Sequence, residues 1–134
     1  MKKAYLLVLI ILILNSCKKQ ADIATTILNN LQGSWELRSS FNGWIGTINY
    51  PAGNGHNYVF TGNTYKIYDN GTITKQGTYV LTQQFSTFQN RQVNSVVFDH
   101  DTSVPVTTID LNGDQLTLSI EAYDAGGSVY QRME

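Results

Sequence analysis

Residues 63–81, NTYKIYDNGTITKQGTYVL, decide the fold of this chain. Apolar and polar side chains alternate on both sides of Asn70-Gly71, and such alternation is typical of strands with one face in a core and one face in water. Asn-Gly is the strongest short-range hairpin signal, because a type I′ turn needs positive φ at both central residues. The stretch therefore predicts two neighbouring antiparallel strands. Lys75 falls on the apolar face of the second strand, so we expect a β-bulge near Gln76-Gly77 that restores the alternation.

The chain from Ser34 onward repeats this texture of short strands and turns. Threonine, valine and tyrosine are frequent there, and glycine and asparagine interrupt the runs at short intervals. Asn112-Gly113-Asp114 predicts a second tight hairpin of the same kind. We expect strands at 33–41, 44–50, 56–61, 64–69, 72–82, 93–99, 104–111 and 115–122, with a last segment at 127–133 that either closes a barrel or replaces the weak strand at 44–50.

This succession predicts an all-β fold, an eight-stranded antiparallel up-and-down β-barrel preceded by a short N-terminal helix. A small sheet that closes on itself removes the exposed edges that invite aggregation. The helix is expected over residues 23–31, where Asp22 can cap its start and apolar residues recur on one stripe. Gly33 lies just past its end. So short a helix is not stable alone in water, and its stripe must dock on the barrel.

The first residues of the chain differ from the rest. Two lysines precede an unbroken apolar run from Ala4 to Leu14. A basic start, an apolar middle and a small residue at the end form a secretory signal, whereas a membrane-spanning helix needs about 20 apolar residues. We therefore expect a signal peptide at residues 1–16, a lipidated cysteine and tether at 17–22, and a single domain at 23–134.

The tetrapeptide Leu14-Asn15-Ser16-Cys17 resembles the lipobox of bacterial lipoproteins. The resemblance implies cleavage after Ser16, a diacylglyceryl group on the Cys17 sulfur, and an acyl chain such as palmitate on the new N-terminus. Cys17 is the only cysteine and cannot form an internal disulfide, which supports this interpretation over a plain secretory signal with an incidental thiol. Several buried acyl chains would anchor the domain to a membrane of the cell envelope, with the outer membrane favoured and the periplasmic or surface face left open.

The sequence Gly33-Ser34-Trp35-Glu36-Leu37 resembles the Gly-x-Trp opening of the lipocalin and wider calycin families. The stretches Tyr58–Tyr65, Asn70-Gly71, Gly77–Leu81 and Tyr130-Gln131-Arg132 are similar to small lipocalin-like lipoprotein domains of Bacteroidetes-type bacteria. The resemblance covers residues 23–134 and implies that Trp35 plugs the closed end of the barrel, with Arg132 over its ring as a structural pair. The chain is far shorter than typical lipocalins. An eight-stranded barrel is wide enough either to be filled by its own side chains or to hold one small ligand.

Composition and motifs exclude several classes of function. Nine basic and ten acidic side chains provide no concentrated positive field, which argues against nucleic acid. Two histidines, and no nucleophile-elbow or phosphate-binding motif, lead us to expect no enzyme activity, no cofactor and no metal site. Asp99-His100-Asp101 is a weak metal candidate, because strand alternation would separate His100 from the carboxylates. Asp110, Asn112 and Asp114 fit a polar hairpin better than a calcium loop, and His56 is expected in a loop.

The binding hypothesis rests on large side chains that strand alternation directs toward the interior of the barrel. Several tyrosines inside a barrel need partners for their hydroxyls, which indicates a partly polar interior. Either they line a pocket for a small apolar ligand, in the barrel or at its mouth, or their rings fill the core. The candidate ligand-binding residues are Tyr58, Phe60, Tyr65, Ile67, Tyr79, Leu81, Phe98, Leu118 and Ile120, and Tyr130 is expected to face inward with them.

A second apolar cluster consists of Trp44, Ile45, Ile48 and Tyr50, beside the glycine-rich loop at 53–55. Exposed at the open mouth, it would be a lid or a contact patch for a protein partner. We therefore expect a membrane-anchored, lipocalin-like lipoprotein that binds a small apolar ligand. The alternative is a protein-interaction module with a filled core, such as an inhibitor of an envelope hydrolase, with no small-molecule ligand.

Overall fold

The computed structural model of this protein describes residues 25–134. The expected signal peptide, the lipidated Cys17, the tether and the helix cap Asp22 lie outside the described residues. A helix occupies residues 25–31, within the expected range. The strands are β1 (Gly33–Asn42), β2 (Gly46–Asn49), β3 (His56–Thr61), β4 (Thr64–Asp69), β5 (Thr72–Ser86), β6 (Arg91–Phe98), β7 (Thr107–Asn112), β8 (Gln115–Ile120) and β9 (Gly127–Arg132).

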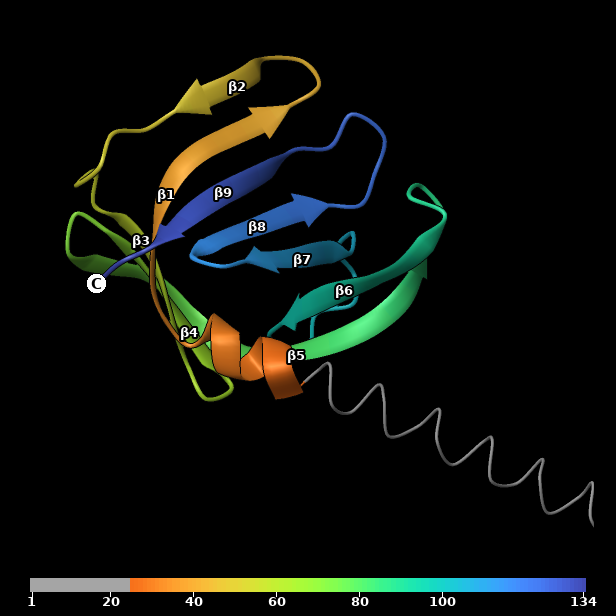
Figure 1. Ribbon diagram of the computed structural model, residues 1–134, viewed down its shortest axis with the longest axis horizontal. Coiled ribbons are helices and arrows are strands. Elements are labelled where there is room, and N and C mark those ends of the chain that lie inside the picture. The colour runs from red at the N-terminus through yellow and green to blue at the C-terminus, as the bar shows by residue number, and fades with distance from the viewer. Residues whose placement is uncertain (1–24) are drawn as a thin grey trace, which may run out of the picture.

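The strands form one antiparallel sheet that closes on itself (Figure 1). From β3 to β9, neighbours in the chain are neighbours in the sheet, and β9 pairs with β1 to complete the ring. The first half of β1 pairs with β3 and its second half with β2, so β2 is a side strand outside the ring. The predicted eight-stranded antiparallel barrel with a short N-terminal helix is confirmed. The last segment, β9, takes the place that the weak strand at 44–50 does not fill.

The β4–β5 turn has the predicted type, whereas the β7–β8 turn has another. Between β4 and β5, Asn70 and Gly71 have φ of 50° and 79°, both positive as a type I′ turn requires. Between β7 and β8 the two turn residues are Gly113 and Asp114. Gly113 has φ of 59°, and Asp114 is not among the residues with positive φ, which is the pattern of a type II′ turn. Glycine at the first central position, and not an Asn-Gly pair, makes the second hairpin.

The bulge predicted near Gln76-Gly77 lies instead at Thr74. The register between β4 and β5 shifts between Ile67 and Tyr68, which leaves Thr74 without a partner in β4. The glycine that prompted the prediction has a different role. A Cβ at Gly77 would lie 1.8 Å from Oδ1 of Asp99, so the missing side chain gives space to that carboxylate.

The longest hairpin, β5–β6, extends beyond the expected strand limits. β5 pairs with β4 over its first part and with β6 from Tyr79 to Ser86. In the described part of the chain, two residue pairs join β6 to β7, which makes this the shortest seam of the ring. At the tip of the hairpin, the Phe88 ring meets Tyr123 of the β8–β9 loop edge to face, with 5.0 Å between ring centroids.

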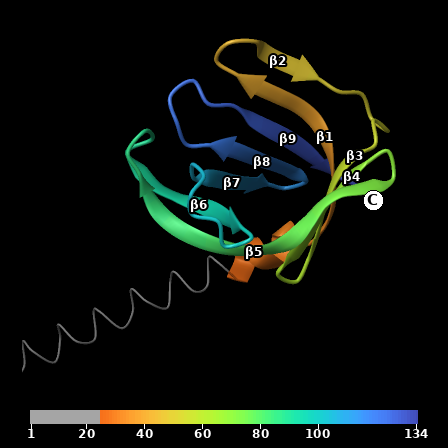
Figure 2. The ribbon, with the colours of Figure 1, turned by 180° about the vertical axis from the view of Figure 1, so that it is seen from behind.

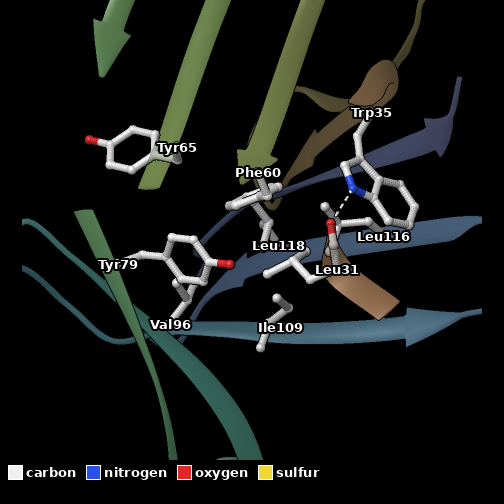
Figure 3. Close-up of a cluster of buried hydrophobic side chains, with 9 residues drawn as sticks. All are labelled: Leu31, Trp35, Phe60, Tyr65, Tyr79, Val96, Ile109, Leu116 and Leu118. Atoms are coloured by element: carbon white, nitrogen blue, oxygen red, sulfur yellow. Dashed lines mark hydrogen bonds between the residues drawn. The ribbon is translucent and has the colours of Figure 1, made fainter. Parts of the chain in front are cut away.

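The hydrophobic core fills the end of the barrel beside the helix, which we call the base, and Figure 3 shows its buried side chains. Its buried members are Leu31, Trp35, Phe60, Tyr65, Tyr79, Val96, Ile109, Leu116 and Leu118. The helix lies beside β5 in both views (Figures 1 and 2) and buries Leu31 completely. These core side chains all lie within residues 25–134, the part of the chain that the structure describes. Within these residues, no helix is long and apolar enough to cross a membrane.

Candidate ligand site at the mouth of the barrel

Trp35 and Arg132 close the base. Trp35 is fully buried, and its Nε1 donates a hydrogen bond of 2.8 Å to the Leu31 carbonyl oxygen, which ties β1 to the helix (Figure 3). The Arg132 guanidinium lies 4.2 Å from the centroid of the Trp35 ring, within the range of a cation–π contact. It also donates to the carbonyl oxygens of Asn30 (2.5 Å) and Gln32 (2.8 Å), which helical hydrogen bonds leave unsatisfied. These contacts join β9 to β1 and to the end of the helix, as a structural pair would.

Four of the predicted ligand-binding residues are buried in the core cluster, namely Phe60, Tyr65, Tyr79 and Leu118, and Leu81 packs against it, as Tyr58, Ile67 and Phe98 also do. Of these four, Leu118 also lines the open end of the barrel. Their polar atoms have partners. The Tyr79 hydroxyl donates to a carbonyl oxygen in the β3–β4 turn (2.7 Å), and the Tyr65 hydroxyl donates to Asp99 (2.7 Å). Burial, together with the Asp99 carboxylate, raises the pKa of Tyr65, so its hydroxyl remains a donor. At the base, the barrel is therefore filled by its own side chains.

A hollow of about 510 Å³ opens at the opposite end, where β1 ends and β9 begins. We call this end the mouth and this space the mouth hollow. Four predicted ligand residues line it, namely Tyr58, Phe98, Leu118 and Ile120, together with Tyr130. None of the described residues that line it carries a charge. Ile120 is 48% exposed, so it lies at the rim and not deep in the barrel.

A second hollow of about 320 Å³ lies beside the first, among β1, β3, β4 and β9. We call it the tyrosine hollow; its lining includes Tyr50, His56, Tyr58, Ile67, Asp69 and Tyr130. His56 begins β3, where it pairs in register with Asp69, so its expected place in a loop was wrong. The ladder extends to this residue because the strand partner continues to Asp69. Nδ1 of His56 lies 3.3 Å from Oδ1 of Asp69.

Tyr58 and Tyr130 line both hollows and form the boundary between them. Their rings meet edge to face, with 5.4 Å between centroids and an interplanar angle of 89°. Tyr58 also stacks on Phe60 at 5.3 Å, which connects the mouth to the packed base. Burial raises the pKa of both phenols, and the neighbouring Tyr130, Tyr65 and Asp99 add to the shift at Tyr58. Both hydroxyls therefore stay neutral at physiological pH.

The expected mouth patch separates into two parts. Trp44 and Ile45, at the β1–β2 turn, are 86% and 72% exposed, and Ile48 on β2 is exposed as well. The side chain of Asn42 holds the turn, since its Oδ1 accepts the N–H groups of Trp44 (3.0 Å) and Ile45 (2.7 Å). We call Trp44, Ile45 and Ile48 the exposed hairpin. Tyr50 does not belong to it, because Tyr50 is half-buried and lines the tyrosine hollow.

A buried carboxylate fixes the loop that follows β2. Glu36 accepts the backbone N–H groups of Gly53 and Gly55 and pairs with the Arg38 guanidinium. Burial of this carboxyl raises its pKa, but these donors outweigh burial, so the pKa of Glu36 lies below its ordinary value. The glycine-rich loop beside the mouth is therefore tied to β1.

The two metal candidates are explained by other contacts. Asp99 and His100 have φ of 55° and 58° and form a turn after β6, so strand alternation does not apply to them. The Asp99 carboxylate instead accepts the Tyr65 hydroxyl and the Thr78 N–H (3.0 Å). At the other candidate, Asp114 accepts a hydrogen bond of 3.1 Å from Arg132. Within residues 25–134, no three potential ligands among His, Cys, Asp and Glu are grouped so that they could hold a metal ion.

Sequence reasoning missed the places of three residues, two of which line the tyrosine hollow while the third joins the helix to the barrel. His56 and Asp69 have the parity of Tyr58 and Ile67, so extending the alternation to the strand ends would have placed them in the mouth. Gln32 had no signal in the sequence. Its side chain joins the helix to the β3–β4 turn, donating to the Gly62 carbonyl oxygen (3.2 Å) and accepting the Gly62 N–H (2.6 Å).

A scan against protein-family models, a search of curated proteins and a search of solved structures found no match to this chain. The closed eight-stranded barrel is consistent with a lipocalin-like fold. Membership of the calycin superfamily and a Bacteroidetes-type source stay predictions from the sequence.

Proposed function

We propose that this protein binds a small apolar molecule at the mouth of its barrel and does so as a lipoprotein of the bacterial cell envelope. The mouth hollow, at about 510 Å³, is the observation that carries the proposal. Small-molecule sites are typically concave spaces of roughly 300–1,000 Å³, with mainly apolar linings and a few polar groups that fix orientation. The rings of Phe98 and Tyr130 supply apolar surface here, and Thr107 and Ser128 supply hydroxyls.

We propose binding and not catalysis. The described residues that line the mouth hollow include no carboxylate, imidazole, amine or thiol. General acid–base chemistry needs such groups within hydrogen-bond reach of the reacting atoms, and a serine nucleophile needs an adjacent base. Ser119 and Ser128 are the hydroxyls of β8 and β9 at this site, and His56 belongs to the lining of the other hollow.

The proposed location rests on the sequence around Cys17. An acylated Cys17 would hold the protein on a membrane, because each buried methylene group contributes about 0.8 kcal/mol. Replacing Cys17 with Ser in the producing bacterium should move the protein from the membrane fraction to the soluble fraction and should abolish incorporation of labelled palmitate. Unchanged membrane association of Cys17→Ser would contradict the proposed anchor.

Native mass spectrometry of residues 20–134, purified without detergent, tests the proposed binding. We expect a fraction of the protein to carry an additional mass of lipid-like size. In Ser128→Phe the added ring should reduce this fraction, because Ser128 lines the mouth hollow. Gln76→Phe is the matched control, since this exposed residue lines neither hollow and the same ring there should leave the fraction unchanged.

Two results of this experiment would contradict binding at the mouth. One is an equal loss of ligand in both phenylalanine variants. The other is the absence of bound mass in the wild type even after incubation with a long-chain alcohol. Circular dichroism melting of each variant must accompany the measurement, so that a loss of ligand is not confused with a loss of fold.

The exposed hairpin supports a second candidate function, the contact with a protein partner. Trp44 at 86% exposure and Ile45 at 72% place apolar surface in water, and tryptophan is enriched at the centres of protein interfaces. Trp44→Ala should then abolish partner capture from an envelope extract at an unchanged melting temperature. Equal capture by wild type, Trp44→Ala and Gln76→Phe would remove this candidate.

A further inference from the structure

We propose that the tyrosine hollow receives a cationic head group, such as an alkylammonium, whose apolar tail lies in the mouth hollow. The inference rests on the proposed function and adds the chemical class of the ligand. It concerns the smaller space, of about 320 Å³, among Tyr50, His56, Tyr58, Asp69 and Tyr130.

Aromatic rings line the tyrosine hollow in two edge-to-face pairs. Tyr58 and Tyr130 meet at an interplanar angle of 89°, with 5.4 Å between centroids. Tyr50 and His56 meet at 70°, with 6.2 Å between centroids. All four rings line the hollow, and ring faces attract cations through their quadrupole. Aromatic cages of this kind recognise quaternary ammonium groups.

The charges around the tyrosine hollow favour a cation. Asp69 contributes a carboxylate to the lining, and no lysine or arginine is among the described residues that form it. His56, 3.3 Å from this carboxylate, adds a positive charge only when it is protonated. The nearest basic side chain on β1, Arg38, is paired with Glu36. Lys75, the cross-strand partner of Ile67, lies 3.8 Å from the Asp99 carboxylate. Among the described lining residues, a fatty-acid carboxylate would therefore meet only a protonated His56 as a cationic partner, and it would also meet the negative charge of Asp69.

The two hollows are placed to share one ligand. Tyr58 and Tyr130 line both of them, so a molecule that contacts this ring pair reaches either space. The mouth hollow has no charged lining residue in the described chain and suits a tail, whereas the tyrosine hollow holds the carboxylate and suits a charged head. The whole described chain, with nine acidic and five basic side chains, carries a net negative charge that attracts cations.

Isothermal titration calorimetry on residues 20–134 tests the inference with three ten-carbon probes used below their micelle concentrations: decyltrimethylammonium, decanol and decanoate. We expect decyltrimethylammonium to bind at least about tenfold more tightly than decanoate. Asp69→Asn keeps the shape of the side chain and removes its charge, so it should weaken decyltrimethylammonium about fivefold and leave decanol unchanged. Asp110→Asn is the matched control, because it removes the same charge from an exposed position outside both hollows.

Each outcome separates this inference from the proposed function. Equal affinity for all three probes would overturn the cation preference and leave apolar binding at the mouth intact. A preference for decanoate, or an equal loss of affinity in Asp69→Asn and Asp110→Asn, would also overturn it. Binding of none of the probes would contradict the proposed function itself. A fourth probe, decylphosphocholine, tells a free alkylammonium from a phospholipid head group, since its phosphate should be disfavoured beside Asp69.

Discussion

The base and the mouth of this barrel are built from the same residue types and behave differently. At the base, Phe60, Tyr65 and Tyr79 are buried, and helix, indole and guanidinium close the end. At the mouth, Tyr58, Phe98 and Tyr130 remain partly exposed around a hollow. The difference comes from what covers each end, because the helix seals the base and the described chain places no such element over the mouth.

An inward-pointing side chain can therefore be either a core residue or a binding residue, and strand parity alone does not distinguish the two. Tyr65 and Tyr58 both point into the barrel, yet Tyr65 has Asp99 as a fixed partner whereas Tyr58 lines two open spaces. The first arrangement contributes stability and the second leaves surface for a ligand. Substitutions at the base should therefore reduce the free energy of unfolding more than substitutions at the mouth.

The largest effect is expected at the base for Trp35→Ala. This change removes a fully buried ring, its hydrogen bond to Leu31 and the surface under Arg132. We expect a loss of about 3–5 kcal/mol in the free energy of unfolding, measured by urea denaturation with circular dichroism. A loss below about 1 kcal/mol would show that the indole does not hold the base together.

Glu36→Gln should have the next largest effect and should depend on pH. The variant keeps the shape of a buried side chain but removes the charge that accepts the Gly53 and Gly55 N–H groups, so we expect a loss of about 1–3 kcal/mol at pH 7. Because the folded pKa of Glu36 is lowered, its contribution is present above the ordinary glutamate pKa of about 4.3 and is lost as the pH falls through the folded value. Denaturation at several pH values should show the two proteins converging in acid; a difference that grows toward acid would be the wrong sign.

Tyr130→Ala tests the mouth side of the comparison. The residue is half-buried at the boundary of the two hollows, so its removal should cost about 1–2 kcal/mol, less than Trp35→Ala. Ligand affinity should fall in the same variant, whereas Trp35→Ala should weaken binding only in proportion to unfolding. Equal destabilisation by the two variants would remove the contrast between the ends of the barrel.

The smallest effect is expected for Trp44→Ala on the exposed hairpin. Its ring is 86% exposed, so stability should change by less than about 0.5 kcal/mol. The stability of Asn42→Ala should be measured beside that of Trp44→Ala, because this variant removes the oxygen that accepts the Trp44 and Ile45 N–H groups. A large loss of stability in Trp44→Ala would mean that the ring is covered in solution.

Local chemistry made most of the fold predictable from the sequence. Alternation and the Asn70-Gly71 turn located β4 and β5 and their hairpin, and the same pattern gave an antiparallel barrel. The bulge lies at Thr74 and not at Gly77, because Gly77 has another role that strand alternation cannot reveal, leaving space for Asp99, a residue 22 positions later in the chain. Contacts across the barrel decide such details.

The candidate site was predictable only in part. Parity identified Tyr58 and Phe98, which line the mouth hollow. Parity could not separate these mouth residues from Phe60 and Tyr79, because the distinction depends on where the helix docks on the barrel and not on the pattern within a strand.

Chemical-shift mapping by NMR tests the central claim most directly, namely a base filled by its own side chains and a mouth that receives a ligand. Residues 20–134, labelled at methyl and aromatic groups, would be titrated with decanol as a neutral probe. We expect shift changes at Phe98, Leu118, Ile120 and Tyr130, with the Trp35 indole and the Leu31 and Leu116 methyl groups unchanged. Changes centred on Trp35, or no saturable change at the mouth, would contradict this claim.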